Sequence, residues 1–127
     1  MSYFNYPDRA RQLIDYSELE CGGLMPTDID GFFEYHDKAF VMFEYKYKDA
    51  KMSKGQQIAL ERAVDAFQKA GKCGVLLLCR HDVTDTSQVV NAARATVTDL
   101  YYKGKWRDNI NKPVMQVKED IIKFVEK

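Results

Sequence analysis

The chain has 127 residues, of which 46% are hydrophobic and 13% aromatic, and its 19 basic and 19 acidic residues give a net charge of zero. This length is enough for one domain with a real core and excludes two independent ones, and the composition excludes a disordered chain. There is no apolar run of roughly 18 residues, no signal-peptide pattern, and no CxxC pair among Cys21, Cys73 and Cys79. We therefore expect a single cytoplasmic domain with reduced thiols.

The first predicted element is a helix from Pro7 to about Leu19, ended by the glycines at 22 and 23. Its apolar stripe comprises Ala10, Leu13, Ile14 and Leu19. Glu18 and Glu20 lie near the C-terminal end of this helix, where the helix dipole does not favour acidic side chains. Solvent exposure accounts for either residue, and a role in a site is the alternative.

Two strands around a polar turn are predicted between residues 28 and 48. Side chains alternate along a strand, so Met42, Glu44 and Lys46 share one face, and their odd-numbered neighbours share the other. A three-residue loop at 36–38 would pair Tyr35 with Ala39.

That register places Asp30 opposite Glu44, and Asp28 opposite Lys46. Side chains directly opposed across two strands have Cβ atoms roughly 4.5–5.5 Å apart, which allows two carboxylates to bind one cation. Because two bare carboxylates that close repel, a divalent metal is their natural partner. A solvated face of mixed charges is the alternative for this hairpin.

The second half of the chain predicts alternating helices and strands. Ser53 is a predicted N-cap with Gln56 completing a capping box, and the helix runs to about Ala70 before Gly71. Its expected core face comprises Ile58, Ala59, Ala63, Ala66, Phe67 and Ala70. The apolar run at 75–79 predicts a strand buried on both faces.

The remaining predicted elements complete a central sheet flanked by helices. A short helix is expected within 84–93, then a strand at 96–98 and an aromatic and basic segment at 101–107. A last helix opens near Asn111 and Pro113, with Val117, Ile121, Phe124 and Val125 facing inward. The predicted fold is α/β with a mixed sheet, in the order α-β-β-α-β-α-β-α.

The segments 26–31 and 43–46 together resemble the core of the PD-(D/E)xK nuclease superfamily, especially its small phage and Holliday-junction-resolvase-like members. The resembling features are an Asp-bearing strand, then Glu-x-Lys on the next strand, then the helix start at 53–56 and an apolar strand. The order spans roughly residues 7–81. The resemblance implies a restriction-endonuclease-like core and a Mg²⁺- or Mn²⁺-dependent deoxyribonuclease.

By this resemblance Asp30 and Glu44 match the metal-binding acids, and Lys46 matches the lysine that orients or acidifies the attacking water. Gln56 matches a glutamine found after the motif in some subfamilies, although its capping role is a sufficient alternative. Pro26 does not immediately precede an aspartate, so Asp28 is a second candidate ligand. The resemblance also implies that a glutamate from the first helix reaches the metal, for which Glu20 is the candidate.

Charge along the chain is less even than its sum. Residues 8–37 hold eight acidic and two basic residues, a balance of −6, so the remainder of the chain carries +6. An acidic metal site within basic surroundings suits a nuclease. The expected DNA-contacting residues are Lys48, Lys51, Lys54, Lys103, Lys105, Trp106 and Arg107.

Two other classes of protein are consistent with these residues. One is a DNA-binding module on a nuclease fold that does not cut. The other is a phage interaction protein that inhibits a host defence complex through the acidic segment 8–37. The shortness of the chain also predicts a homodimer or a partner protein for target choice.

Overall fold

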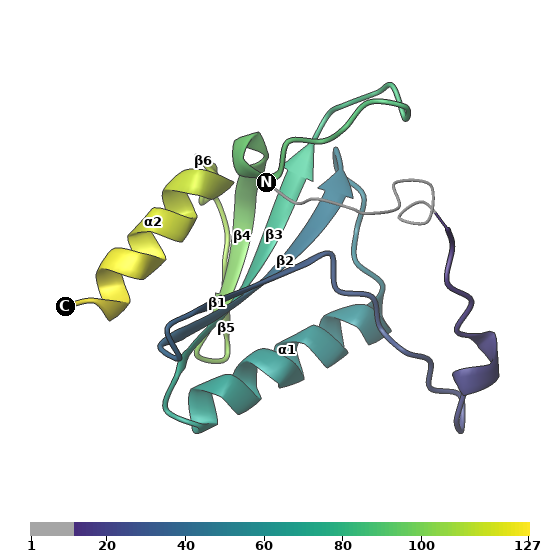
Figure 1. Ribbon diagram of the computed structural model, residues 1–127, viewed down its shortest axis with the longest axis horizontal. Helices are drawn as coiled ribbons and strands as arrows, with labels where there is room; N and C mark the ends of the chain where they lie inside the picture. Colours follow the sequence, from purple (N-terminus) through teal and green to yellow (C-terminus); the bar gives the residue numbers. More distant parts are fainter. Residues whose placement is uncertain (1–11) are drawn as a thin grey trace.

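The computed structural model describes residues 12–127, which form a mixed α/β domain (Figure 1). The strands are β1 (Gly31–Tyr35), β2 (Ala39–Tyr47), β3 (Cys73–His81), β4 (Thr96–Tyr102), β5 (Lys105–Arg107) and β6 (Lys112–Pro113). The helices are α1 (Lys54–Lys69) and α2 (Val114–Val125), with 3-10 turns η2 (Ser17–Leu19) and η3 (Ala92–Arg94). Within this part of the chain, no helix is long and apolar enough to cross a membrane.

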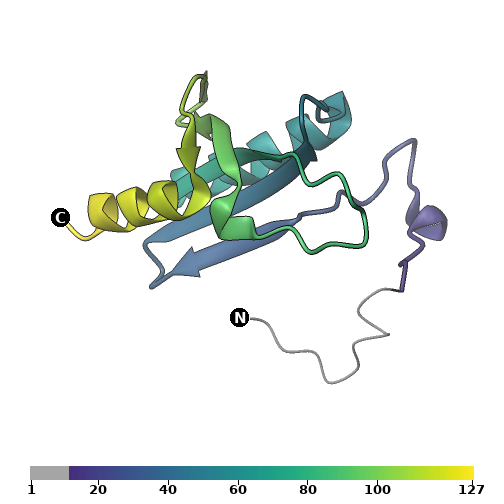
Figure 2. The same cartoon turned by 90° about the horizontal axis from the view of Figure 1, so that it is seen from above.

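The sheet has the strand order β1-β2-β3-β4-β5, with β6 paired to β4. β2 and β3 are parallel and are connected through α1, whereas the other paired strands in residues 12–127 are antiparallel. Figures 1 and 2 show α1 and α2 as separate layers against the strands. The prediction of a mixed sheet flanked by helices is confirmed.

The two helices cover opposite faces of the sheet, because neighbouring residues on one strand, such as Val41 and Met42, pack with different helices. On the α2 side the core contains Val41, Val75, Leu77, Cys79, Val97, Val117 and Ile121. On the α1 side it contains Met42, Leu60, Val64, Leu76 and Tyr101. β3 contributes to both cores, which confirms that this apolar strand is buried on both faces.

The predicted N-terminal helix is wrong for the residues that can be compared. Residues 12–16 have no helical structure and η2 covers only three residues, while positions 7–11 lie outside the described residues. Leu13 is 98% exposed and Ile14 is 68% exposed, so these two members of the expected apolar stripe are not buried in a core. A short helix without such packing is marginal in water.

The β1–β2 hairpin has the predicted register. Tyr35 pairs with Ala39 and Gly31 pairs with Phe43. His36 and Asp37 adopt left-handed conformations in the turn, with φ of 48° and 60°. The expected alternation of faces is also confirmed, because Met42 lies in the α1-side core and Val41 in the α2-side core.

Helix α1 starts as predicted, and the face it presents to the sheet is predicted in part, since Ala63 and Phe67 pack against the core as expected. The Ser53 hydroxyl accepts a hydrogen bond from the Gln56 backbone N–H at 3.2 Å, as an N-cap should. The buried residues are Leu60 and Val64, while Ile58, Ala66 and Ala70 are exposed. Leu60 and Val64 follow Gln56 at intervals of four residues, so all three lie on one face of the helix. Because Gln56 is polar, the spacing of apolar residues does not identify it as the first residue of this face.

The predicted helix at 84–93 is also wrong, except for the short turn η3. The segment that follows Thr84 has no helix before η3, and Asp85 Oδ1 accepts hydrogen bonds from the Ser87 backbone N–H and hydroxyl. Such local side-chain bonds offer the backbone an alternative to a helix. The strand at 96–98 is confirmed as the first part of β4.

The last helix is confirmed as α2, beginning at Val114, but one of its expected core residues is not buried. Val117 and Ile121 lie in the core, whereas Phe124 is 54% exposed. Its ring meets the Tyr102 ring edge-on, with centroids 6.3 Å apart.

Gly74 marks the closest approach of β3 to α1. A Cβ at this position would lie 2.7 Å from the Val64 carbonyl oxygen and 2.9 Å from Phe67 Cβ. We expect Gly74→Ala to lower the free energy of unfolding by about 1–3 kcal/mol, because helix backbone must move to relieve the clash. Urea denaturation would measure this, with Gly55→Ala as the control, since a Cβ on Gly55 meets nothing within 4 Å. An unfolding midpoint of Gly74→Ala equal to that of the wild type would contradict this close packing.

Candidate active site

Glu44 is a buried acid in the middle of the sheet. It lies on β2, on the face that carries α1, and is 2% exposed. One carboxylate oxygen, Oε1, lies 3.3 Å from Lys46 Nζ. The other, Oε2, is the one buried side-chain polar atom in residues 12–127 that has no hydrogen-bond partner. Leaving such an atom unpaired costs about 1–3 kcal/mol, so the fold retains it at the expense of stability.

Asp30 lies beside Glu44, as the register predicts. It directly precedes β1, whose first residue pairs with Phe43, so the next pair along the hairpin is Asp30 and Glu44. Asp30 is exposed, and its Oδ2 accepts a hydrogen bond from the Tyr45 backbone N–H at 2.8 Å. This bond fixes the Asp30 carboxyl at the mouth of the buried site.

The surroundings of Glu44 disfavour its charge. Burial raises the pKa of Glu44, and the negative charge of the nearby Asp30 carboxyl raises it further, while Lys46 acts in the opposite direction. Two neighbouring carboxyls with one lysine thus make a site that would bind a cation favourably.

Lys46 is positioned by two partners. Its Nζ lies 3.3 Å from Glu44 Oε1 and donates a hydrogen bond to Gln56 Oε1 at 3.4 Å. The side chain of Lys46 is 22% exposed, so it remains open to solvent while it is held. Gln56 therefore contributes both to the helix cap and to the site: its backbone N–H donates to the Ser53 hydroxyl, and its side chain holds Lys46.

The residues present fit a divalent cation that keeps most of its water ligands better than one that is coordinated entirely by protein side chains. No group of three or more His, Cys, Asp or Glu side chains that could hold a metal occurs in residues 12–127. Mg²⁺ commonly binds through one or two carboxylates and keeps several waters, and Asp30 with the unpaired Glu44 Oε2 provides that set. Asp28 and Glu20 do not join Asp30 and Glu44 in such a group, and Glu20 Oε1 instead accepts a hydrogen bond from the Gly23 backbone N–H.

A groove of about 930 Å³ lies next to Lys46. One wall is the segment 23–28, and the other is the first half of α1 with the preceding loop. Its charged lining residues are Asp28, Lys46, Lys51 and Arg62. Arg62 was not anticipated from the sequence, although its spacing of seven residues from Gly55 places both on one helix face.

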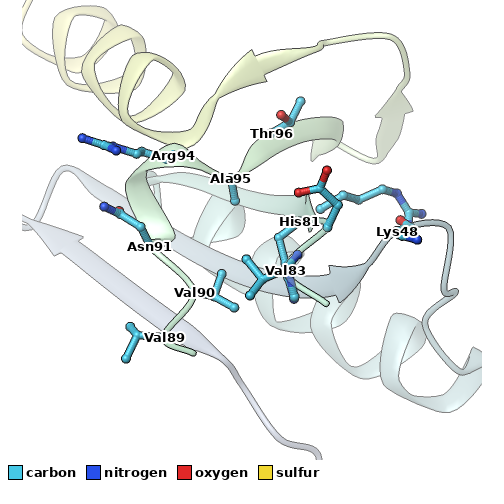
Figure 3. Close-up of a pocket in the computed structure, with 11 residues that line it drawn as sticks. Lys48, His81, Val83, Val89, Val90, Asn91, Arg94, Ala95 and Thr96 are labelled. Atoms are coloured by element: carbon cyan, nitrogen blue, oxygen red, sulfur yellow. Dashed lines mark hydrogen bonds between the residues drawn. The ribbon is translucent and has the colours of Figure 1, made fainter. Parts of the chain in front are cut away.

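A second cavity, of about 500 Å³, lies at the carboxyl ends of β2 and β3, and its lining includes Lys48 and His81 (Figure 3). Arg80 Nη1 donates hydrogen bonds to the Lys48 and Ala50 carbonyl oxygens, both at 2.7 Å, and so holds the connection from β2 to α1. His81 Nδ1 accepts a hydrogen bond from the Val83 backbone N–H at 3.2 Å. Arg80 and His81 thus have structural partners, and Lys54 lies at the start of α1 outside both cavities.

The structure does not bring the aromatic and basic segment to the acidic site. The register aligns Trp106 with Tyr101 and Leu76, whereas Lys46 aligns with Arg80. Four residues of β3, about 13 Å, separate Trp106 from the level of Lys46, and two residues, about 7 Å, separate it from the level of Glu44, which aligns with Leu78. Glu44 on β2 and Trp106 on β5 are also three strands apart across the sheet. Lys103 and Lys105 flank the β4–β5 turn beyond Trp106, and so lie farther still from the acidic site.

Trp106 and Arg107 in this segment have structural roles. Trp106 Nε1 donates a hydrogen bond to Glu61 Oε2 at 2.7 Å, and its ring packs on Tyr101. The Arg107 guanidinium lies 5.4 Å from the centroid of the Tyr102 ring. DNA contact by this segment stays a prediction, and it would be made away from Glu44.

No protein-family model, curated protein or solved structure matches this chain significantly. The fold and the site define it as a mixed α/β domain with a buried glutamate, an exposed aspartate next to it, a lysine held beside the glutamate and an adjoining groove.

Proposed function

We propose that this protein is a metal-dependent nuclease that hydrolyses phosphodiester bonds in DNA. The observation that carries the proposal is the buried Glu44 carboxyl, whose Oε2 has no hydrogen-bond partner and whose Oε1 lies 3.3 Å from Lys46 Nζ on the same strand. The Asp30 carboxyl is close enough to raise the pKa of Glu44. An ion pair that only stabilises the fold would need one carboxylate, with both of its oxygens bonded. A second acid placed against the first is unfavourable unless a cation binds there.

Each residue of the site has a role in the proposed reaction. Asp30 and Glu44 would hold Mg²⁺ or Mn²⁺, which when bound would lower the pKa of a coordinated water and offset charge on the phosphoryl oxygens. Lys46 Nζ orients the attacking water or stabilises the charge that develops on the phosphoryl group. Gln56 keeps Lys46 in place through the hydrogen bond to Nζ.

The topology supports the same proposal. What supports it is the succession of the β1–β2 hairpin, α1 and β3 parallel to β2, with Asp30 directly before β1 and Glu44 and Lys46 on β2. The helix expected before the hairpin departs from that core, because residues 12–19 contain only η2.

Cleavage of supercoiled plasmid and of a labelled branched oligonucleotide would test the proposal. We expect cutting with Mg²⁺ or Mn²⁺, none with EDTA, and a decrease on the order of 100-fold or more in Asp30→Asn, which removes a charge that the metal needs. Asp85→Asn is a matched control, since Asp85 is exposed and bonds only locally to Ser87. A folded wild-type protein that cuts neither substrate with either metal would overturn the proposal.

A further inference from the structure

The groove beside Lys46 has two chemically different linings. Its charged side chains are three cations, Lys46, Lys51 and Arg62, and one acid, Asp28, so the groove has a net positive lining. Its large apolar side chains are Leu24, Met25 and Ile58. The apolar residues are exposed, with Leu24 at 74% and Met25 at 50%. Exposed apolar side chains that share one groove with cations indicate a ligand that carries both an apolar and an anionic part.

We infer that this groove binds a single nucleic-acid strand, with its phosphates against Lys46, Lys51 and Arg62 and its bases against Leu24, Met25 and Ile58. The inference rests on the proposed function, because the groove contains Lys46 and so leads to the acidic pair. Proteins that bind single strands combine a cationic path for the backbone with a surface on which bases pack.

The shape of the groove favours one strand over a duplex. The wall at 23–28 stands opposite α1, and the groove between them is about 930 Å³, within the range of pockets for small molecules. A flexible strand can bend to enter such a space. A duplex is stiff over about 150 base pairs, and its bases are paired and stacked, so they cannot reach the apolar wall.

Arg62 is the residue whose role separates this inference from a general attraction to DNA. It lies on α1 six residues after Gln56, which corresponds to about 9 Å along the helix axis. A phosphate bound by Arg62 would therefore lie beyond the one at Lys46 and hold the strand in register. Lys69 is on the same helix, is also exposed, and does not line the groove.

Fluorescence anisotropy of the full chain in EDTA would test the inference, with a labelled 12-mer of thymidylate and a labelled hairpin duplex as probes. We expect tighter binding of the single strand, and for Arg62→Ala an increase of about fivefold in its Kd together with a salt slope reduced by about 0.7, the value for one phosphate of a single strand. Lys69→Ala removes the same charge and is expected to leave both values unchanged.

Equal affinity for the two probes, no binding of either, or equal effects of Arg62→Ala and Lys69→Ala would each overturn the inference. Parallel cleavage assays with Mg²⁺ keep the two proposals distinguishable. Binding of the single strand without any cleavage would reject the nuclease and retain the groove. Metal-dependent cleavage without a preference for single strands would retain the nuclease and reject the groove.

Discussion

Replacing Glu44 with glutamine is expected to abolish metal-dependent cleavage and, at the same time, to stabilise the metal-free protein. The substitution removes a buried charge whose Oε2 has no partner, and it gives Asp30 a neighbouring N–H donor in place of a competing carboxyl. The gain in unfolding free energy should be on the order of 1–2 kcal/mol, which is the cost of an unpaired buried polar group. Thermal unfolding in EDTA would show it as an increase of several degrees in Tm.

The effect of Glu44→Gln should depend on pH in a defined direction. The pKa of Glu44 is raised in the folded protein, mainly by burial, so ionising it costs stability. This cost is absent below the ordinary value of 4.5, where the acid is protonated in both states, and it grows as the pH rises above that value. The Tm difference between wild type and Glu44→Gln should therefore be small at pH 4 and largest near neutrality.

Metal binding should reverse the order of stability. Mg²⁺ or Mn²⁺ is expected to raise the Tm of the wild type, because a ligand that binds only the folded state stabilises it, and to leave Glu44→Gln unchanged. Glu119→Gln is the control, since Glu119 is exposed on α2. A Glu44→Gln protein that is less stable than the wild type in EDTA near neutral pH would show that Glu44 is satisfied without a metal.

The site was predictable where local geometry determines it. The polar turn after Tyr35 fixed the hairpin register, and that register alone brought Asp30 to Glu44 and placed Lys46 on the same face as Glu44. Both effects follow from the two-residue period of a strand. The capping box likewise placed Gln56 at the start of α1, where its side-chain oxygen accepts a hydrogen bond from Lys46 Nζ.

Other features depend on tertiary contacts that a local pattern does not contain. Apolar spacing assigned the face of α1 only in part: it identified Ala63 and Phe67 but missed Leu60 and Val64, which are the residues buried against the sheet. The aromatic and basic segment was grouped with the site by its composition. The chain instead continues antiparallel from β3 through β4 to β5, at the edge of the sheet opposite β1, where Trp106 bonds to Glu61.

Lys46→Met is expected to lower both the stability of the fold and the rate of cleavage, and the two effects can be measured separately. Without Lys46 Nζ the Glu44 carboxylate loses its cationic partner, so the unfolding free energy in EDTA should fall by about 1–3 kcal/mol. Cleavage should fall on the order of 100-fold or more, because no other cation in the described chain lies within 4 Å of the Glu44 carboxylate. Urea denaturation and plasmid cleavage would measure the two quantities.

The double variant Glu44→Gln/Lys46→Met resolves the two roles of this pair. If Lys46 stabilises the fold only by pairing with Glu44, the double variant regains the stability that Lys46→Met loses, and the two substitutions are strongly non-additive. Cleavage should remain lost, because neither the ligand nor the lysine is present. If the effects of the two substitutions on stability are instead additive, Lys46 stabilises the fold through its contact with Gln56 and not through its pairing with Glu44. The pair would then be a structural feature of β2, and the acidic site would have to bind its metal without help from the lysine.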